Sequence, residues 1–219
     1  MKKILTSLFA VMFFTATAYA EVRIGLSGAY SMFTSDGTET VKSSGTKNSK
    51  SHDEDVVVPS IFFEADLANG MALGLDFIPV GAELGSATNA RTDTDTDDAS
   101  DTAGDNKVSA ELSGHTTLYV TYPIRGNGYV KGGLAIASID TTESLATGTE
   151  YKNEDVTGIM IGAGYNRDGN NGLFFRSEVT YTDYDSANFK GTLDADGVRN
   201  EIDADIDVLA LRFSVGKAF

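Results

Sequence analysis

Eight ionisable side chains lie within otherwise apolar segments, and they are the residues of this 219-residue chain best placed to do chemistry. Successive residues of a β-strand point to opposite faces, so charges at alternate positions would meet on one face. We expect a structural network of ion pairs; the alternative is a gated pore in which the pairs exchange partners and admit small ions. The eight are Arg23, Glu64, Asp66, Asp76, Lys131, Arg176, Glu178 and Arg212.

The two histidines do not form a recognisable catalytic set. His52 precedes two acids in a polar stretch, but neighbours along a chain rarely make a triad, because its groups must converge from separate segments. His115 shares a strand face with hydroxyl residues and has no obvious carboxylate to orient it. We therefore expect no enzymatic activity.

A run of alternating aspartates is the candidate metal site. Asp93, Asp95, Asp97 and Asp98 carry the oxygen ligands that Ca²⁺ prefers. The run lacks the glycine and the later glutamate of EF-hand spacing, so we expect a solvated acidic loop, with divalent cation binding as the alternative. The chain has no cysteine, which excludes disulfides and thiolate chemistry, and we expect no cofactor.

The elements that must position these residues are strands, because the dominant hydrophobic period is two. Apolar residues alternate with small, polar or charged ones in each segment. Leu112, for example, is expected on the apolar face of its segment with Leu118 and Val120. The eight segments cover residues 21–32, 56–67, 71–80, 109–123, 129–139, 156–166, 173–183 and 206–219.

The connections between these segments alternate strictly between short and long. Residues 67–70, 125–128 and 167–171 are short and contain the Asn-Gly or Asp-Gly pairs of hairpin turns. The expected loops at 33–55, 81–107, 140–155 and 184–204 are long and polar. In an up-and-down meander, all the long loops then leave from one end and all the short turns from the other.

A charged inner face beneath an apolar outer face indicates a membrane-spanning barrel. An outward Arg or Lys at the bilayer midplane would cost about 2–4 kcal/mol, which favours placing the charges inside. A soluble β-sandwich, the alternative, would have its apolar face inside and connections not sorted by length. The sequence thus predicts an all-β, eight-stranded antiparallel transmembrane β-barrel at residues 21–219.

Residues 1–20 are expected to be a cleaved signal peptide. Lys2 and Lys3 precede a mostly apolar stretch at 4–17, and Ala18-Tyr19-Ala20 matches a small-x-small cleavage site. The apolar stretch is short and interrupted for a spanning helix, although an uncleaved anchor is the alternative.

Counted back from a terminal Phe219, every second residue of the last strand is apolar except Lys217, and the apolar positions include Val215 and Phe213. This pattern resembles the terminal signature that the assembly machinery of bacterial outer-membrane proteins recognises. The whole mature chain resembles the small eight-stranded barrels of the OmpA-transmembrane, OmpX and OmpW type, including the α-proteobacterial surface antigens. The likeness is architectural and includes no long family-specific motif.

The resemblance implies a bacterial outer-membrane location, with extracellular long loops and periplasmic termini. It implies a structural or surface-interaction role through acidic loops, or alternatively a porin-like passive channel for small solutes. Outer-membrane lipid, lipopolysaccharide and the barrel assembly machinery are the expected partners. A net charge of −15 argues against nucleic acid, and a monomer is expected. Aromatic residues are expected to form girdles at both interfaces, with Tyr129 in the one at the short turns.

Overall fold

The computed structural model describes residues 21–41, 45–67, 69–91, 104–144, 150–192 and 201–219. The predicted signal peptide and Asp93, Asp95, Asp97 and Asp98 lie outside these residues, so both interpretations stay predictions. In the part of the chain that the structure describes, no helix is long and apolar enough to cross a membrane.

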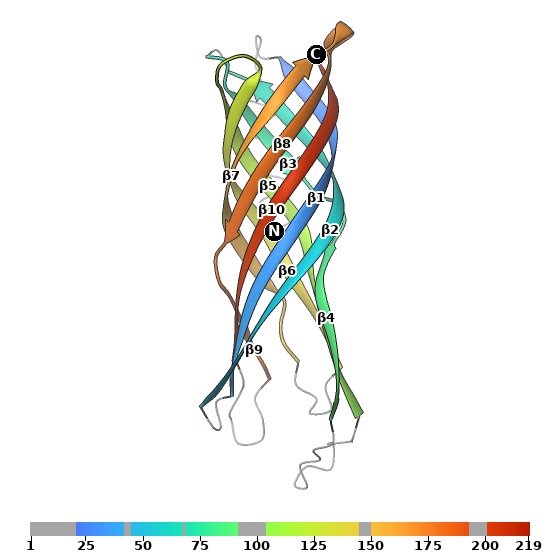
Figure 1. Ribbon diagram of the computed structural model, residues 1–219, viewed down its shortest axis with the longest axis vertical. Coiled ribbons are helices and arrows are strands. Elements are labelled where there is room, and N and C mark those ends of the chain that lie inside the picture. The colour runs from blue at the N-terminus through green and yellow to red at the C-terminus, as the bar shows by residue number, and fades with distance from the viewer. Residues whose placement is uncertain (1–20, 42–44, 68, 92–103, 145–149, 193–200) are drawn as a thin grey trace.

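Eight antiparallel strands form a closed ring, which confirms the predicted architecture (Figure 1). Each strand pairs with its neighbours in chain order, and the last pairs with the first over Arg23–Thr40. The ring consists of β1 (Val22–Val41), β2 (Thr46–Asp66), β3 (Ala72–Phe77), β5 (Gly104–Pro123), β6 (Gly128–Ser144), β7 (Glu154–Asp168), β8 (Leu173–Tyr184) and β10 (Glu201–Ala218).

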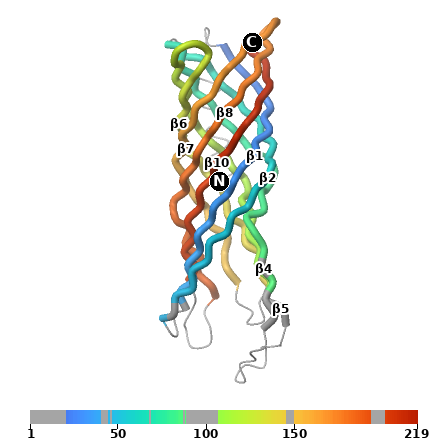
Figure 2. Tube along the Cα trace, in the orientation of Figure 1, coloured from blue at the N-terminus to red at the C-terminus, as the bar shows by residue number. Residues whose placement is uncertain are grey.

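Two shorter strands continue the wall where ring strands stop. β4 (Ala82–Arg91) pairs with β5 beyond the end of β3. β9 (Ala187–Lys190) pairs with β10 beyond the end of β8. β4 and β9 therefore lengthen the wall where β3 and β8 end, and the ring still has eight strands. All strands are inclined to the long axis of the barrel, as Figure 2 shows.

The three predicted short connections lie together at the end of the barrel that holds the C-terminus (Figure 1). Backbones with positive φ make these turns tight, at Gly126 (φ 73°) and at Asn171 (φ 60°), the types that tolerate this conformation best. Asn171 lies in a single 3₁₀ turn, η1 (Asn170–Gly172), between β7 and β8.

Strands run much further toward the other end than the sequence indicated. The predicted loop at 33–55 is largely strand, because β1 and β2 stay paired up to Val41 and Thr46. Its residues are almost all polar, so the alternation that marked the other strands is lacking there. Backbone ladder bonds and polar cross-strand pairs, such as Thr38 with Ser49 (3.0 Å between hydroxyl oxygens), hold the hairpin together.

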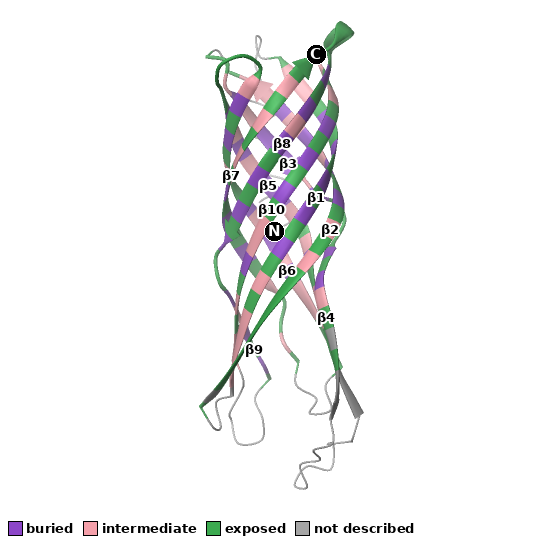
Figure 3. Ribbon diagram, viewed as in Figure 1, coloured by how far each residue is buried: buried purple, intermediate pink, exposed green. Residues whose placement is uncertain are grey.

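Side chains alternate between the two faces of the wall as predicted, which produces the checkered exposure of Figure 3. In the half that holds the short turns, the outward residues are mostly apolar, and the inward positions hold glycines, polar residues, charges and a few aromatic rings such as Phe174. The most exposed large apolar residues on the strands include Leu26, Val57, Leu134, Ile159, Ile161, Phe175 and Phe213.

A β-bulge in β5 makes the prediction for Leu112 wrong. Between Ser113 and Thr116, β5 has one residue more than the facing part of β6, and Gly114 adopts a φ of 59°. An extra residue shifts a strand's alternation by one. Leu112 therefore points inward, where it pairs with Ile139 and is 5% exposed.

Tyr129 does not belong to an outer girdle. It shares the inward parity of Lys131 on β6 and is buried in the lumen, while its neighbour Val130 is exposed. The hydrophobic period of two had already placed Val130 on the outer face, which puts its neighbour Tyr129 on the inner face. The prediction for Tyr129 was wrong because it relied on the position of this residue near the barrel end.

Candidate functional site

Arg176 is the centre of a buried polar layer that crosses the lumen. Its guanidinium donates two hydrogen bonds to the two carboxylate oxygens of Glu64, and its Nε donates to Asn166 at 3.2 Å. It also lies 5.0 Å from the ring centroid of Phe174. The Glu64 carboxylate accepts a further bond from the Tyr119 hydroxyl at 2.8 Å. A planar, bidentate pair of this kind is the strongest ionic contact that side chains make.

Lys131 and Glu178 form the second ion pair of this layer, with 3.0 Å between Nζ and Oε1. The ammonium also lies 3.8 Å from the centroid of the Tyr119 ring. Both side chains are almost completely buried. Tyr119 thus contacts both ion pairs, and it joins them into one network.

Arg212 and Asp76 form the third pair, and Ser60 bonds to both of them. The Ser60 hydroxyl donates to Asp76 at 3.0 Å and accepts from Arg212 at 3.1 Å. At the short-turn rim, Arg23 contacts Asp66 at 3.0 Å, with both side chains partly exposed. All eight charges predicted to share a face thus lie inside the barrel, and each pairs with an opposite charge from the same set.

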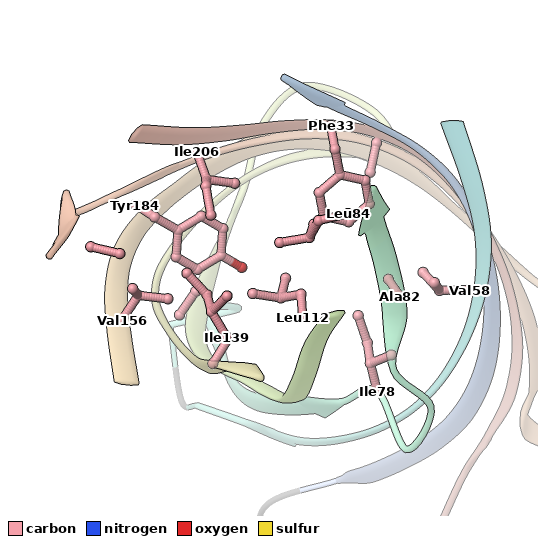
Figure 4. Packing of buried hydrophobic residues seen from close by; sticks show 14 of the residues in the cluster. Phe33, Val58, Ile78, Ala82, Leu84, Leu112, Ile139, Val156, Tyr184 and Ile206 are labelled. Atoms are coloured by element: carbon pink, nitrogen blue, oxygen red, sulfur yellow. The ribbon is translucent and has the colours of Figure 1, made fainter. Parts of the chain in front are cut away.

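An apolar layer closes the lumen on the long-loop side of these pairs. Side chains from strands all around the ring point into its centre, as Figure 4 shows. None of the residues labelled there is more than 9% exposed. The apolar layer includes Phe33, Val58, Ile78, Leu112, Ile139, Val156, Tyr184 and Ile206.

Above the apolar layer the wall divides into two ribbons. One consists of β9, β10, β1 and β2, and the other of β4, β5 and β6. Among the described residues, no strand ladder joins β2 to β4. On the other side, Tyr151 forms a bridge with Gly191, just after β9, and the Thr192 backbone N–H donates to the Glu150 carbonyl at 3.1 Å. Figure 1 shows the ribbons diverging toward the long-loop end.

A cavity of about 270 Å³, here called the mouth cavity, lies between the two ribbons. Its floor is apolar and its rim is polar, with Lys50 and His52 on one ribbon and Glu143 on the other, near Tyr151. Burial and the carboxylates of Glu39 and Glu143 raise the pKa of Tyr151. The apolar lining includes Leu84, Val108, Ile139, Phe189, Ile202 and Ile206.

The structure does not bring the histidines together. His52 is on β2, where its Nε2 lies 3.4 Å from Glu54. His115 lies at the bulge of β5, with its ring centroid 6.2 Å from that of Tyr184. Among the described residues, no group of three or more metal-ligating side chains is close enough to hold a metal ion.

The mouth cavity and the role of Tyr119 were missed by sequence reasoning. A signal for the cavity was present, because Val108, Ala110 and Leu112 alternate, as do Ile202, Ala204 and Ile206. Both runs lie inside or next to segments assigned as long loops. Three alternating apolar residues beside acidic stretches were too short a pattern to distinguish strand from loop.

Solved structures share this architecture. OprG from Pseudomonas aeruginosa is 14% identical, with a TM-score of 0.56, over 92% of this chain and 98% of its own. The outer membrane protein AlkL is 14% identical, with a TM-score of 0.50, over 93% and 92%. The outer membrane protease OmpT from Escherichia coli is 9% identical, with a TM-score of 0.50, over 93% and 99%.

These identities are low, so the similarity concerns the fold alone. No protein-family model matches the chain. No curated protein matches it either. The protease activity in the name of OmpT belongs to that protein.

Proposed function

The chain folds as a small outer-membrane β-barrel, and we propose that it acts at the cell surface through the long-loop half of that barrel, with its lumen closed. The observation that carries this proposal is strand length. A strand of 20 residues, such as β1, is about 66 Å long and, at a tilt of about 40°, about 50 Å high. The lipid-facing band of such barrels is about 25 Å high. Roughly half of the wall would then stand outside the membrane.

The outward residues of β1 support this position of the membrane. They are apolar from Ile24 to Met32 and change beyond it to Thr34, Asp36 and two further threonines. On the neighbouring β2, Asp55 accepts a hydrogen bond from the Tyr30 hydroxyl at 2.6 Å. Tyr181 donates to Asp207 in the same way at 2.7 Å. Tyrosines with an apolar body and a polar tip are typical of a membrane–water interface.

The protruding half would face the medium, with both ends of the mature chain in the periplasm after removal of residues 1–20. Its acidic loops would contact other surfaces, including the lipopolysaccharide around the barrel. Asp93, Asp95, Asp97 and Asp98 would bind divalent cations there at most weakly. Long loops outside and short turns inside are the usual orientation of such barrels.

This orientation can be tested on intact cells because the chain has no cysteine. A single cysteine at Ser49, in the exposed β1–β2 hairpin, is expected to react with a membrane-impermeant maleimide. The matched variant Asn127→Cys, in an exposed short turn, is expected to react only after the cells are broken. Equal labelling of the two in intact cells would refute the orientation, and labelling of N127C alone would reverse it.

A porin-like channel, the alternative function, receives no support from the lumen. An eight-stranded barrel has room for its inner side chains and little more. Here three buried ion pairs and then an apolar layer fill the path. An ion would have to break pairs that are costly to separate and then cross a region without polar partners.

We therefore expect the folded protein to produce no conductance steps in planar bilayers. The control is the same preparation after boiling, distinguished from the folded barrel by its different migration on a gel. Regular single-channel steps that require the folded form would show that the lumen opens. A single gel band, unaffected by boiling, would argue against the barrel itself.

A further inference from the structure

Two cations lie on the outer face of the barrel close to the short turns. Arg167 on β7 and Lys217 on β10 are exposed, and they continue the outward parity of Ile161 and Val215. Among the described residues, no other outward strand position between the short turns and the level of Tyr30 carries a charge. An outward cation is costly at the bilayer midplane and costs little near the interface, where its head can reach the lipid headgroups. The position of these two charges at the barrel end therefore places them among headgroups.

Neither of these outer cations has an anionic partner within the described part of the chain. Among those residues, Arg167 and Lys217 form no ion pair and no side-chain hydrogen bond. The Lys217 ammonium lies 5.2 Å from the centroid of the Phe219 ring, a contact that provides no hydrogen-bond acceptor. By contrast, each of the four cations inside the barrel pairs with a carboxylate. The two outer cations can thus bind an anion from outside the chain.

β8 lies between the two cations and completes a patch, here called the rim patch, that consists of Arg167, Leu173, Phe175 and Lys217. Arg167 is opposite Phe175 in the β7–β8 ladder, and Lys217 is opposite Leu173 in the β8–β10 ladder, as the neighbouring strands of Figure 1 show. Adjacent strands are about 4.8 Å apart, so the strands of the two cations are about 10 Å apart. Both charged side chains are long enough to reach a common group above β8. Leu173 and Phe175, which are 41% and 51% exposed, form an apolar surface between them.

The lipid-facing surface next to the rim patch is suited to acyl chains. In the next row toward the membrane centre, Ser177 on β8 lies between Tyr165 on β7 and Phe213 on β10. The two aromatic side chains are 52% and 60% exposed, and Val179 continues the apolar face of β8 beyond them. An acyl chain along β8 would contact both rings while its headgroup stays at the two cations.

The outward charges have opposite signs at the two edges of the apolar band, and this difference indicates which headgroup the rim patch fits. At the long-loop edge, the outward charges include the exposed carboxylates of Asp36, Asp55 and Asp183. At the short-turn edge, the outward strand charges are those of Arg167 and Lys217. A phosphate group is therefore attracted to the short-turn edge and repelled from the other. An anionic phospholipid combines this phosphate with the apolar chains that β8 accommodates.

We propose that the rim patch binds an anionic phospholipid, in which Arg167 and Lys217 hold the phosphodiester of the headgroup and the acyl chains lie along β8. The planar guanidinium of Arg167 donates paired hydrogen bonds to two phosphate oxygens, and the Lys217 ammonium supplies a compact point charge. This lipid site goes beyond the surface role proposed above. It rests on the position of the apolar band in the membrane, and it does not depend on which leaflet meets the short turns.

The chain contains no tryptophan, so a single introduced indole can report on the lipid beside it. Phe175→Trp places this reporter in the rim patch, and Leu73→Trp places a matched reporter on β3, on the opposite side of the ring. The full mature chain is refolded into mixed vesicles of phosphatidylglycerol and phosphatidylcholine, in which one lipid at a time carries brominated, quenching chains. Phosphatidylglycerol is expected to bind about tenfold more tightly than phosphatidylcholine beside the F175W reporter. Beside the L73W reporter, the two lipids are expected to bind almost equally.

Removing the cations one at a time tests their role in this preference. In the F175W background, Arg167→Gln and Lys217→Gln should each reduce the preference about threefold, and the double variant should abolish it, because each cation supplies a similar attraction. Arg125→Gln is the matched control, since it removes an exposed cation from the β5–β6 turn at the same end of the barrel. This control should keep the preference of the parent. The gel shift on boiling verifies that each variant is folded.

The outcomes separate a lipid site from general attraction and from a phosphate site. Equal quenching by the two lipids in F175W, or a preference that survives the double substitution, would show that the cations hold no headgroup. An equal loss in R125Q would assign the preference to the overall charge of this barrel end. If soluble glycerol phosphate at millimolar concentration abolished the preference, the site would bind free phosphate and no lipid. The vesicles offer both lipids in both leaflets, so a failure here leaves the proposed orientation to its own test with the cysteine variants.

Discussion

Replacing Arg176 by methionine is expected to lower the free energy of unfolding by about 3–5 kcal/mol. The change leaves the Glu64 carboxylate buried without its cation, since only the Tyr119 hydroxyl still donates to it. The side chains of the pair are 4% and 0% exposed, so water cannot replace the guanidinium. Equilibrium unfolding by guanidinium chloride in detergent micelles measures the loss.

Arg23→Met is the matched control, because it removes the same type of side chain from an ion pair at the rim. Arg23 and Asp66 are 20% and 27% exposed, so we expect a loss of at most about 1 kcal/mol. Adding Glu64→Gln to R176M should restore much of the stability by removing the unpaired charge. If R176M and R23M were equally stable, the polar layer would not stabilise the barrel.

Substituting Phe219 by serine is expected to reduce the folded barrel in the outer membrane of growing cells several-fold. We propose that Phe219, with Val215 and Phe213, is the signal that the barrel assembly machinery binds. The Phe219 side chain is 70% exposed and packs little within the barrel. Its backbone bonds to Val22 across the seam of the ring are made whatever the side chain.

The stability of purified F219S refolded in detergent should therefore differ from that of the parent by less than about 1 kcal/mol. Phe175→Ser, which removes another exposed aromatic ring from the outer face, is the control and should assemble normally. The measurement is the amount of heat-modifiable protein in outer-membrane fractions. Equal losses for both variants would indicate a general need for outward aromatic rings, with no specific signal at Phe219.

The membrane half of this fold could be predicted because two simple rules act on it together. Outward residues must be apolar and strands alternate, so the face of Arg176 or Ile161 follows from parity alone. Turn residues such as Gly126 then divide the chain into strands. These rules identify the face of each charge, but they leave its height in the barrel open. The pairing of Glu64 with Arg176, 112 positions later, depends on the stagger of the whole ring.

The other half could not be predicted because the first rule does not apply to it. Residues outside a membrane can be polar on both faces, as on β1 and β2 between Thr34 and Asp55, and a strand then resembles a loop. The mouth cavity lies in that half. Its two walls come from ribbons that do not pair with each other, and only the folded chain shows how they face.

The bulge at Gly114 makes β5 sensitive to insertions and deletions. Inward residues are odd-numbered after the bulge, at Thr117 and Tyr119, and even-numbered before it, at Leu112, so the extra residue sets which side chains face inward. Deleting one residue there would turn the apolar side chains of the part of β5 before the bulge outward and its polar ones inward, whereas a substitution changes one side chain and leaves the number of residues unchanged. An insertion at the loop end of this part of β5 would not restore the original alternation of its side chains. In β5, residue count near position 114 is therefore a stronger constraint than residue type.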